Sequence, residues 1–278
     1  MKRLPETSRP ETPRPETSQI IQVRNLCMDY GAGAVLAGLN LDLSAGSMIG
    51  LIGPNGAGKS TLLALLMGLI RPTAGTIRVS GHPLAAYRPR ALARLMTLVP
   101  QDTRLGFAFK VAEVVAMGRN PHLGRFELPA DHDLELIRIA MEQTGVSGFS
   151  TRTIDTLSGG ERQRTIIARA IAQETPIVLL DEVTANLDLC HQIEVLEVIR
   201  ALVRMGRLVF AAIHDLTLAS RFCDGLILLA EGKIRAAGAA GAVLTEDNLR
   251  RFFNVQAHIE KAPAGGLNIT ALRSVARY

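Results

Sequence analysis

The chain has 278 residues and a mass of 29.9 kDa, enough to bury a substantial core as one large domain or two modest ones. Hydrophobic residues make up 47% and aromatic residues 4%, with no Trp, which excludes a fibrous or wholly disordered chain and favours an aliphatic α/β core. The 31 Lys and Arg against 26 Asp and Glu give a net charge of +5, a modest excess that phosphate-binding and interface loops explain, so we expect no nucleic-acid partner.

The sequence also excludes a membrane-spanning chain. Its longest strongly apolar stretch, Leu62 to Ile70, is far shorter than the roughly 20 residues that a spanning helix needs. The N-terminus lacks the apolar segment of a secretory signal, so we expect any membrane role to come through a partner protein. Cys27, Cys190 and Cys223 show no metal-ligand spacing and indicate packing residues in a reduced, cytosolic compartment.

The N-terminal segment, residues 1–18, carries a five-residue repeat that reads L-P-E-T-S, R-P-E-T-P and R-P-E-T-S. It is rich in Pro, Thr and charge and has nothing to bury, so we expect a disordered tail. Its removal should leave the activity of the chain intact.

Strand patterns begin at Ile20. I-I-Q-V-R-N-L and L-N-L-D-L alternate as half-exposed strands do, and M-I-G-L-I-G is typical of a buried strand. A glycine-rich loop follows and opens a helix predicted from Lys59 to Leu69, which ends before Arg71-Pro72. The segments T-I-R-V-S-G-H and L-M-T-L-V-P predict two further strands, the second of which delivers Gln101.

Between Gln101 and Leu157 the strand pattern stops, and helical periodicity predicts an inserted helical subdomain with helices at Val111 to Met117 and Asp133 to Thr144. Strands then return, interleaved with helices. The predicted strands are Ile177 to Leu180, Leu208 to Ile213 and Leu226 to Leu229, and the helices are Gly160 to Ala172 and Cys190 to Val203. This order indicates a largely parallel sheet covered on both faces.

The glycine-rich loop fits the phosphate-binding pattern G-x-x-x-x-G-K-[ST], in which backbone N–H groups and a helix N-terminus face negative charge. Lys59 is expected to reach the β- and γ-phosphates of ATP, and the Ser60 hydroxyl to coordinate Mg²⁺. The predicted ATP-binding residues of this loop are Gly53, Pro54, Asn55, Gly56, Ala57, Gly58, Lys59, Ser60 and Thr61.

Two carboxylates end the strand I-V-L-L-D-E, at the edge where α/β sheets place ligands. Asp181 is expected to hold Mg²⁺ through water, and Glu182 to polarise the attacking water as general base, a role worth roughly 10²- to 10⁴-fold in rate. The strand L-V-F-A-A-I delivers His214 to the same edge, where it is the candidate contact for the γ-phosphate.

The segment L-S-G-G-E-R-Q-R, from Leu157 to Arg164, indicates a nucleotide site closed by a second subunit. Together with the phosphate loop and the Asp181-Glu182 strand, it resembles the nucleotide-binding subunit of ABC transporters from Ile20 to about Ile259. The resemblance implies an α/β fold: a P-loop NTPase (RecA-like) core with an antiparallel β subdomain and an inserted helical signature subdomain. The expected limits are a tail at 1–18, an ATPase domain at 19–262 with the helical subdomain at about 102–160, and a C-terminal extension at 263–278.

The same resemblance implies further roles. Tyr30 stacks on adenine, and Gln101 contacts Mg²⁺ and senses the transport partner. The signature loop consists of Leu157, Ser158, Gly159, Gly160, Glu161 and Gln163. Two subunits join head to tail as a homodimer, so that Ser158 and Gly160 of one meet the γ-phosphate held by the other, and Asp188 couples the two sites. The family usually has Pro where this chain has Val183, and we expect only a change in local stiffness there.

V-V-A-M-G-R-N-P-H-L-G at Val114 to Gly124 and L-T-E-D-N-L-R-R-F-F-N-V at Leu244 to Val255 resemble segments of metal-chelate importers. This implies an integral membrane permease dimer, a periplasmic or lipid-anchored substrate-binding protein, and a peripheral position on the cytoplasmic face of the inner membrane. The cargo favoured is a ferric siderophore or haem, with cobalamin as the alternative.

Three other functions stay open at this point. A soluble ABC ATPase acting on nucleic acid usually carries long coiled-coil insertions or two cassettes, and this chain shows neither pattern. An exporter subunit would be favoured by a fused membrane domain. A regulator that binds ATP without hydrolysing it is disfavoured by the presence of both Glu182 and His214.

Overall fold

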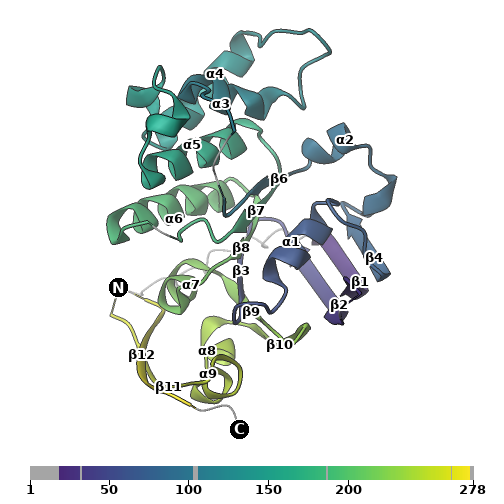
Figure 1. Ribbon diagram of the computed structural model, residues 1–278, viewed down its shortest axis with the longest axis vertical. Coiled ribbons are helices and arrows are strands. Elements are labelled where there is room, and N and C mark those ends of the chain that lie inside the picture. The colour runs from purple at the N-terminus through teal and green to yellow at the C-terminus, as the bar shows by residue number, and fades with distance from the viewer. Residues whose placement is uncertain (1–18, 32, 103–105, 186, 264, 276–278) are drawn as a thin grey trace, which may run out of the picture.

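The computed structural model describes residues 19–275 except 32, 103–105, 186 and 264. The repeat segment that we expect to be a disordered tail, 1–18, lies outside the described residues. A six-stranded sheet forms the centre of the molecule (Figure 1), in the order β10 (Lys233–Gly238), β9 (Gly225–Ala230), β3 (Met48–Ile52), β8 (Leu208–Ala212), β7 (Ile177–Asp181) and β6 (Met96–Val99). Its strands are parallel except β10, which pairs antiparallel with β9.

The central strands are apolar along their whole length because both faces of the sheet are covered. All five residues of β8 are buried. Successive side chains point to opposite faces, so Leu179 packs in one core cluster and Val178 and Leu180 in the other. Helices α5 (Gly159–Ala172), α6 (Leu189–Arg204) and α7 (Leu216–Phe222) cover one face, and α1 (Lys59–Leu66) covers the other.

A four-stranded antiparallel sheet packs with α1 in the second cluster, in the order β2 (Ala34–Ser44), β1 (Gln19–Asp29), β4 (Ala74–Val79) and β5 (His82–Pro83). Along β2 the residues Leu39, Leu41 and Leu43 are buried while those between them are exposed, which is the alternation expected of a half-buried strand. This sheet confirms the antiparallel subdomain that the sequence predicts.

Helices α3 (Val111–Ala116) and α4 (Asp131–Gln143) pack with α5 into a helical lobe at one end of the molecule (Figure 1). Arg119 holds this lobe together. Its Nε donates to Asp133 Oδ1 at 2.8 Å, and its Nη1 donates to the carbonyl of Ala172 at the end of α5, also at 2.8 Å. Arg119 and Asp133 are both buried, so this ion pair is an internal anchor between the lobe and α5.

Helix α1 ends at Leu66, three residues before the predicted end at Leu69. The reason is Gly68, whose φ of 69° is left-handed and stops the helix. The predicted helix starts are wrong by one or two residues elsewhere, since α4 begins at Asp131, α5 at Gly159 and α6 at Leu189.

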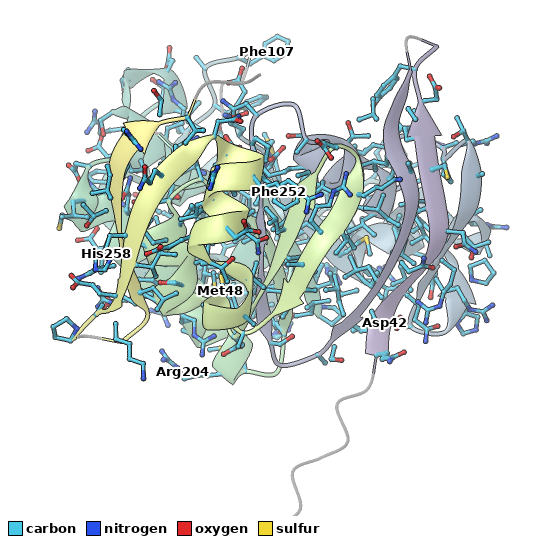
Figure 2. The ribbon with its side chains drawn as sticks, turned by 90° about the horizontal axis from the view of Figure 1, so that it is seen from below. Asp42, Met48, Phe107, Arg204, Phe252 and His258 are labelled. Carbon is cyan, nitrogen blue, oxygen red and sulfur yellow. The ribbon has the colours of Figure 1, made fainter. Side chains whose placement is uncertain are left out.

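The remaining helices are short: α2 (Pro89–Ala93), α8 (Ala240–Val243) and α9 (Glu246–Phe253). The described chain closes with a hairpin of β11 (Val255–Lys261) and β12 (Leu267–Ser274), on the opposite side of the molecule from β1 and β2 in both views (Figures 1 and 2). Residue 262, where we expect the ATPase domain to end, lies in the turn of this hairpin. No helix within the described ranges is both long and apolar enough to cross a bilayer.

Candidate functional site

The carboxyl ends of four parallel strands meet at one edge of the central sheet. Leu51 of β3 and Asp181 of β7 both pair in register with Ala212 of β8, and β6 lies beyond β7. The loops that leave these strands are therefore neighbours. They carry the phosphate loop, the Asp181-Glu182 pair, His214 and Gln101, so the topology brings together residues that are up to about 160 positions apart in the chain.

The phosphate loop folds tightly between β3 and α1, and two of its glycines are required by space. A β-carbon at Gly53 would lie 2.0 Å from the carbonyl oxygen of Leu229, and one at Gly58 would lie 2.7 Å from Leu36 Cδ2. Gly58 is also left-handed, with φ 99°, directly before α1 begins at Lys59. The first N–H groups of α1 therefore point out of the helix at the loop, which is an anion-binding arrangement.

Lys59 connects this loop to the acidic pair. Its side chain is 6% exposed, and Nζ donates to the carbonyl oxygens of Gly53 at 3.0 Å and Pro54 at 3.3 Å. The same nitrogen lies 3.5 Å from Glu182 Oε1. A buried ammonium held between carbonyl groups and a carboxylate is positioned to meet an anion bound at the loop.

Ser60 and Asp181 form an oxygen pair beside Lys59, because Ser60 Oγ donates to Asp181 Oδ1 at 3.2 Å. Burial raises the pKa of Asp181, and the negative charge of Glu182 raises it further, while the hydrogen bond from Ser60 and the charge of Lys59 oppose the shift. The site thus holds a carboxylate whose charge is not fully compensated by its neighbours. Hydroxyl and carboxylate oxygens are ligands that Mg²⁺ accepts.

Glu182 is held by several contacts. Gln101 Nε2 donates to its Oε2 at 3.0 Å, and its backbone N donates to the carbonyl oxygen of Ala212 at 3.1 Å. Its φ of 49° is left-handed, a conformation that costs a non-glycine residue about 1–3 kcal/mol and that clusters at functional sites. His214 follows β8, which lies between β3 and β7, and its side chain is exposed.

The residues of the predicted signature loop lie at the start of α5. Ser158 caps this helix: its Oγ accepts from the backbone N of Glu161 at 3.2 Å, and Glu161 Oε2 accepts from the backbone N of Ser158 at 2.8 Å. That second bond lowers the pKa of Glu161. Ser158 and Gly159 are exposed, whereas Leu157 and Gln163 are buried.

The capped turn lies within a stretch of the chain that matches a known protein family. Residues 36–185 match the family model described as ABC transporter. The chain belongs to the ABC transporter family. This ABC chain is 45% identical over 254 residues to the cobalamin import ATP-binding protein BtuD of Halobacterium salinarum, covering 91% of the chain and 63% of that relative. The chain thus spans less than two thirds of that relative's length.

A second relative of the ABC chain is the hemin import ATP-binding protein HmuV of Nocardia farcinica, which is 40% identical over 254 residues, or 90% of the chain and 88% of the relative. Among solved structures, an ABC transporter of the metal-chelate type in an inward-facing conformation superposes with a TM-score of 0.80 at 31% identity. The superposition covers 92% of the present chain and 98% of the neighbour's chain. This neighbour confirms the predicted P-loop NTPase fold.

Not all predicted site residues of the ABC chain lie together. Lys59, Ser60, Gln101, Asp181 and Glu182 are linked by contacts at the sheet edge. The signature loop and Asp188 form a separate group at the starts of α5 and α6, and within the described residues no hydrogen bond joins 157–163 to the phosphate loop. Tyr30 stands just past the end of β1 and is 59% exposed.

Sequence reasoning missed one residue of the second group. His191 donates through its backbone N to Asp188 Oδ1 at 2.9 Å, and its ring Nδ1 lies 2.6 Å from the same oxygen. The only sequence signal is the spacing D-x-x-H at a helix start, where an Asp cap faces the third residue after it.

Proposed function

We propose that this ABC chain is the ATP-hydrolysing subunit of an importer that energises uptake of an iron chelate, a ferric siderophore or haem, through a membrane permease dimer. The observation that carries the proposal is the chain of contacts at the sheet edge. Lys59, Ser60, Asp181, Glu182 and Gln101 are joined by distances of 3.0 to 3.5 Å. This is the set of groups that phosphoryl transfer to water requires.

The arrangement fits ATP and Mg²⁺. The N–H groups at the start of α1 face the phosphates, and Lys59 exchanges its carbonyl partners for the β- and γ-phosphate oxygens. Ser60 would hold Mg²⁺ directly and Asp181 through water, and Gln101, two residues past the end of β6, would contact it as well. The ion would neutralise phosphate charge. The raised pKa of Asp181 supports this assignment, because a nearby cation stabilises the ionised carboxylate.

Glu182 is the proposed general base, because its carboxylate is fixed by Lys59 and Gln101 at the end of β7. His214 is the proposed contact to the γ-phosphate. Tyr30, exposed just past the end of β1, is the proposed adenine-stacking residue. Val183 is buried directly behind Glu182, and we keep the expectation of a local stiffness change only.

The second group of residues supports a head-to-tail homodimer. Ser158 and Gly159 are exposed, and among the described residues the hydrogen bonds of Ser158 stay within its own helix start, so both residues can serve the site of another copy. We assign Leu157, Ser158, Gly159, Gly160, Glu161 and Gln163 to the signature loop that completes the partner's ATP site. The positive end of α5 then points to the partner's γ-phosphate.

The cargo and partners follow from the relatives. Several are named hemin import proteins at 40–42% identity, and the cobalamin import relative is 45% identical. We favour an iron chelate or haem and retain cobalamin as the second candidate because of that higher identity. The proposal includes a permease dimer, a periplasmic or lipid-anchored binding protein, and attachment to the cytoplasmic face of the inner membrane.

The catalytic assignment is tested by Glu182→Gln. We expect steady-state hydrolysis to fall by about 10²-fold or more, since a positioned general base contributes at least that much. ATP binding should persist, because the loop and Lys59 are unchanged. Release of phosphate and retention of labelled ATP measure the two effects, and wild-type turnover in the variant would exclude Glu182 as the base.

The transport assignment is tested separately. The chain is co-purified with the permease encoded beside it, and ATP turnover is compared with and without binding protein loaded with a ferric siderophore, haem or cobalamin. Stimulation by one chelate identifies the cargo class. Failure to associate with a permease would favour a soluble ABC ATPase.

A further inference from the structure

The imidazole of His191 joins two helix starts. Its Nδ1 lies 2.6 Å from Asp188 Oδ1 at the cap of α6. The same ring packs against Gly160 in the first turn of α5, where a β-carbon would lie 3.7 Å from both Cγ and Nδ1 of His191. The side chain of Leu187 lies equally close to Gly160. The ring therefore contacts the Asp188 carboxylate and lies on the side of Gly160 where a side chain would stand.

The charges around this contact favour an ionised Asp188. The hydrogen bonds from His191 lower the pKa of Asp188, first through the backbone N and then through the ring, and Arg164 adds a smaller effect. Arg164 of α5 also pairs with Glu194 of α6 at 3.3 Å. The starts of α5 and α6 are thus connected at two places. His191 lies between their ends, and the Arg164–Glu194 ion pair joins them one turn further on.

The contact of His191 involves only the group formed by the signature loop and Asp188, among the described residues. Within the described residues, His191 hydrogen-bonds to Asp188 through its backbone and its ring, and neither bond reaches the phosphate loop or Glu182. Its side chain is 35% exposed and lines a groove of about 620 Å³ between α4, α5 and α6. Truncating it therefore leaves no sealed cavity, and a large loss of stability is not expected.

We propose that His191 is a positioning residue that holds the Asp188 carboxylate and the Gly159-Gly160 turn as one rigid edge, presented to the ATP site of a second copy of the chain. The inference rests on the proposed head-to-tail dimer. The ring donates from Nδ1 to the carboxylate and limits the orientations of the cap. A fixed edge loses less entropy when the two copies close on ATP than a mobile one.

The test compares His191→Ala with His191→Asn in the full chain, each alone and with Glu182→Gln. The Asn amide places a donor close to the position of Nδ1, so it restores the bond to Asp188, whereas Ala removes it. His258→Ala is the matched control: this histidine is exposed on β11 of the terminal hairpin and pairs with Glu246 of α9 at 3.6 Å. Each variant is assayed for ATP binding to the monomer, thermal stability, ATP-driven dimerisation and turnover.

For His191→Ala we expect ATP-driven dimerisation in the Glu182→Gln background to weaken by about two- to tenfold, the cost of ordering a released side chain when the two copies close. Turnover should fall in parallel, while monomer ATP affinity and the melting temperature stay at the wild-type level. His191→Asn should recover most of the dimerisation, and His258→Ala should match wild type.

Three results would overturn the inference. These are wild-type dimerisation by His191→Ala, equal impairment by Ala and Asn, or a parallel loss of monomer ATP binding. Failure of the proposed function looks different: the wild-type chain would then neither hydrolyse ATP nor dimerise with Glu182→Gln in place, whatever residue stands at 191.

Discussion

At the residue scale, the site places one buried ammonium group, that of Lys59, beside the carboxylates of Asp181 and Glu182. Lys59 is shared between loop carbonyls and Glu182, and within the described residues the hydrogen-bond donor to the side chain of Asp181 is the Ser60 hydroxyl. Burial raises the pKa of Asp181. Burial of this carboxylate therefore carries an electrostatic cost at the position where we place Mg²⁺.

This cost predicts the effect of Asp181→Asn. An acid whose pKa is raised on folding binds more protons in the folded state, so the stability of the wild type falls as pH rises from about 4 through the raised value. The Asn variant lacks this slope. We expect it to melt higher than wild type at pH 7 without nucleotide, with the difference vanishing below the ordinary carboxyl range, and to lose hydrolysis. Melting curves from pH 3.5 to 8 measure it, and a lower melting temperature at pH 7 would contradict the account.

The sequence predicts the charged residues of the site only where they directly follow a motif or a strand. Lys59 and Ser60 follow the glycine loop directly, and Asp181 and Glu182 end a recognisable strand, so their convergence follows from parallel-strand topology. The left-handed backbone of Glu182 depends on three-dimensional packing, and no spacing rule predicts it. The bond between the His191 ring and Asp188 has only the D-x-x-H spacing as a signal, which predicts a helix cap but not the position of the ring.

At the element scale, the helical lobe depends on one internal ion pair. Arg119 and Asp133 are both buried, and Arg119 also bonds to Ala172 at the end of α5. Asp133 has its pKa lowered by Arg119, so its ionised form is stabilised by that partner. The sequence marks this region only as the segment G-R-N-P-H-L-G of the importer type.

Arg119→Ala is predicted to reduce the free energy of unfolding by about 3 kcal/mol or more, because it leaves a buried carboxylate without its partner. Arg138→Ala is the control on the same lobe, since Arg138 pairs with Glu135 and Glu142 on the exposed face of α4 and should contribute little. Urea unfolding of both variants measures the two losses in the free energy of unfolding. Equal stability of the two variants would show that the pair is not an anchor.

The elements that the sequence predicts well are those with strong periodicity. The buried parallel strands and α4, α5 and α6 agree with the predicted order within one or two residues at their starts. The terminal hairpin was not predicted. Most of β12 is exposed, so it lacks an alternating pattern, and its fit depends on a distant contact, in which Ser220 Oγ of α7 accepts from the backbone N of Leu267 at 2.8 Å.

At the scale of the whole molecule, one chain carries two halves of a site that do not meet within it. The phosphate loop, Glu182 and His214 lie at the sheet edge, and Ser158 and Asp188 lie at the starts of α5 and α6. The fold accounts for the position of each half within the chain. The proposed head-to-tail dimer would explain why both are present, and it is the central claim of this account.

Subunit mixing tests this claim most directly. Lys59→Ala damages the phosphate loop and Ser158→Arg damages the signature loop, so each variant alone should be inactive, although Ser158→Arg still binds ATP. In a mixed head-to-tail dimer, one site combines both defects and the other combines an intact phosphate loop with an intact signature loop. We predict that mixing the two variants restores single-turnover hydrolysis, whereas a mixture as inactive as its components would contradict the shared site.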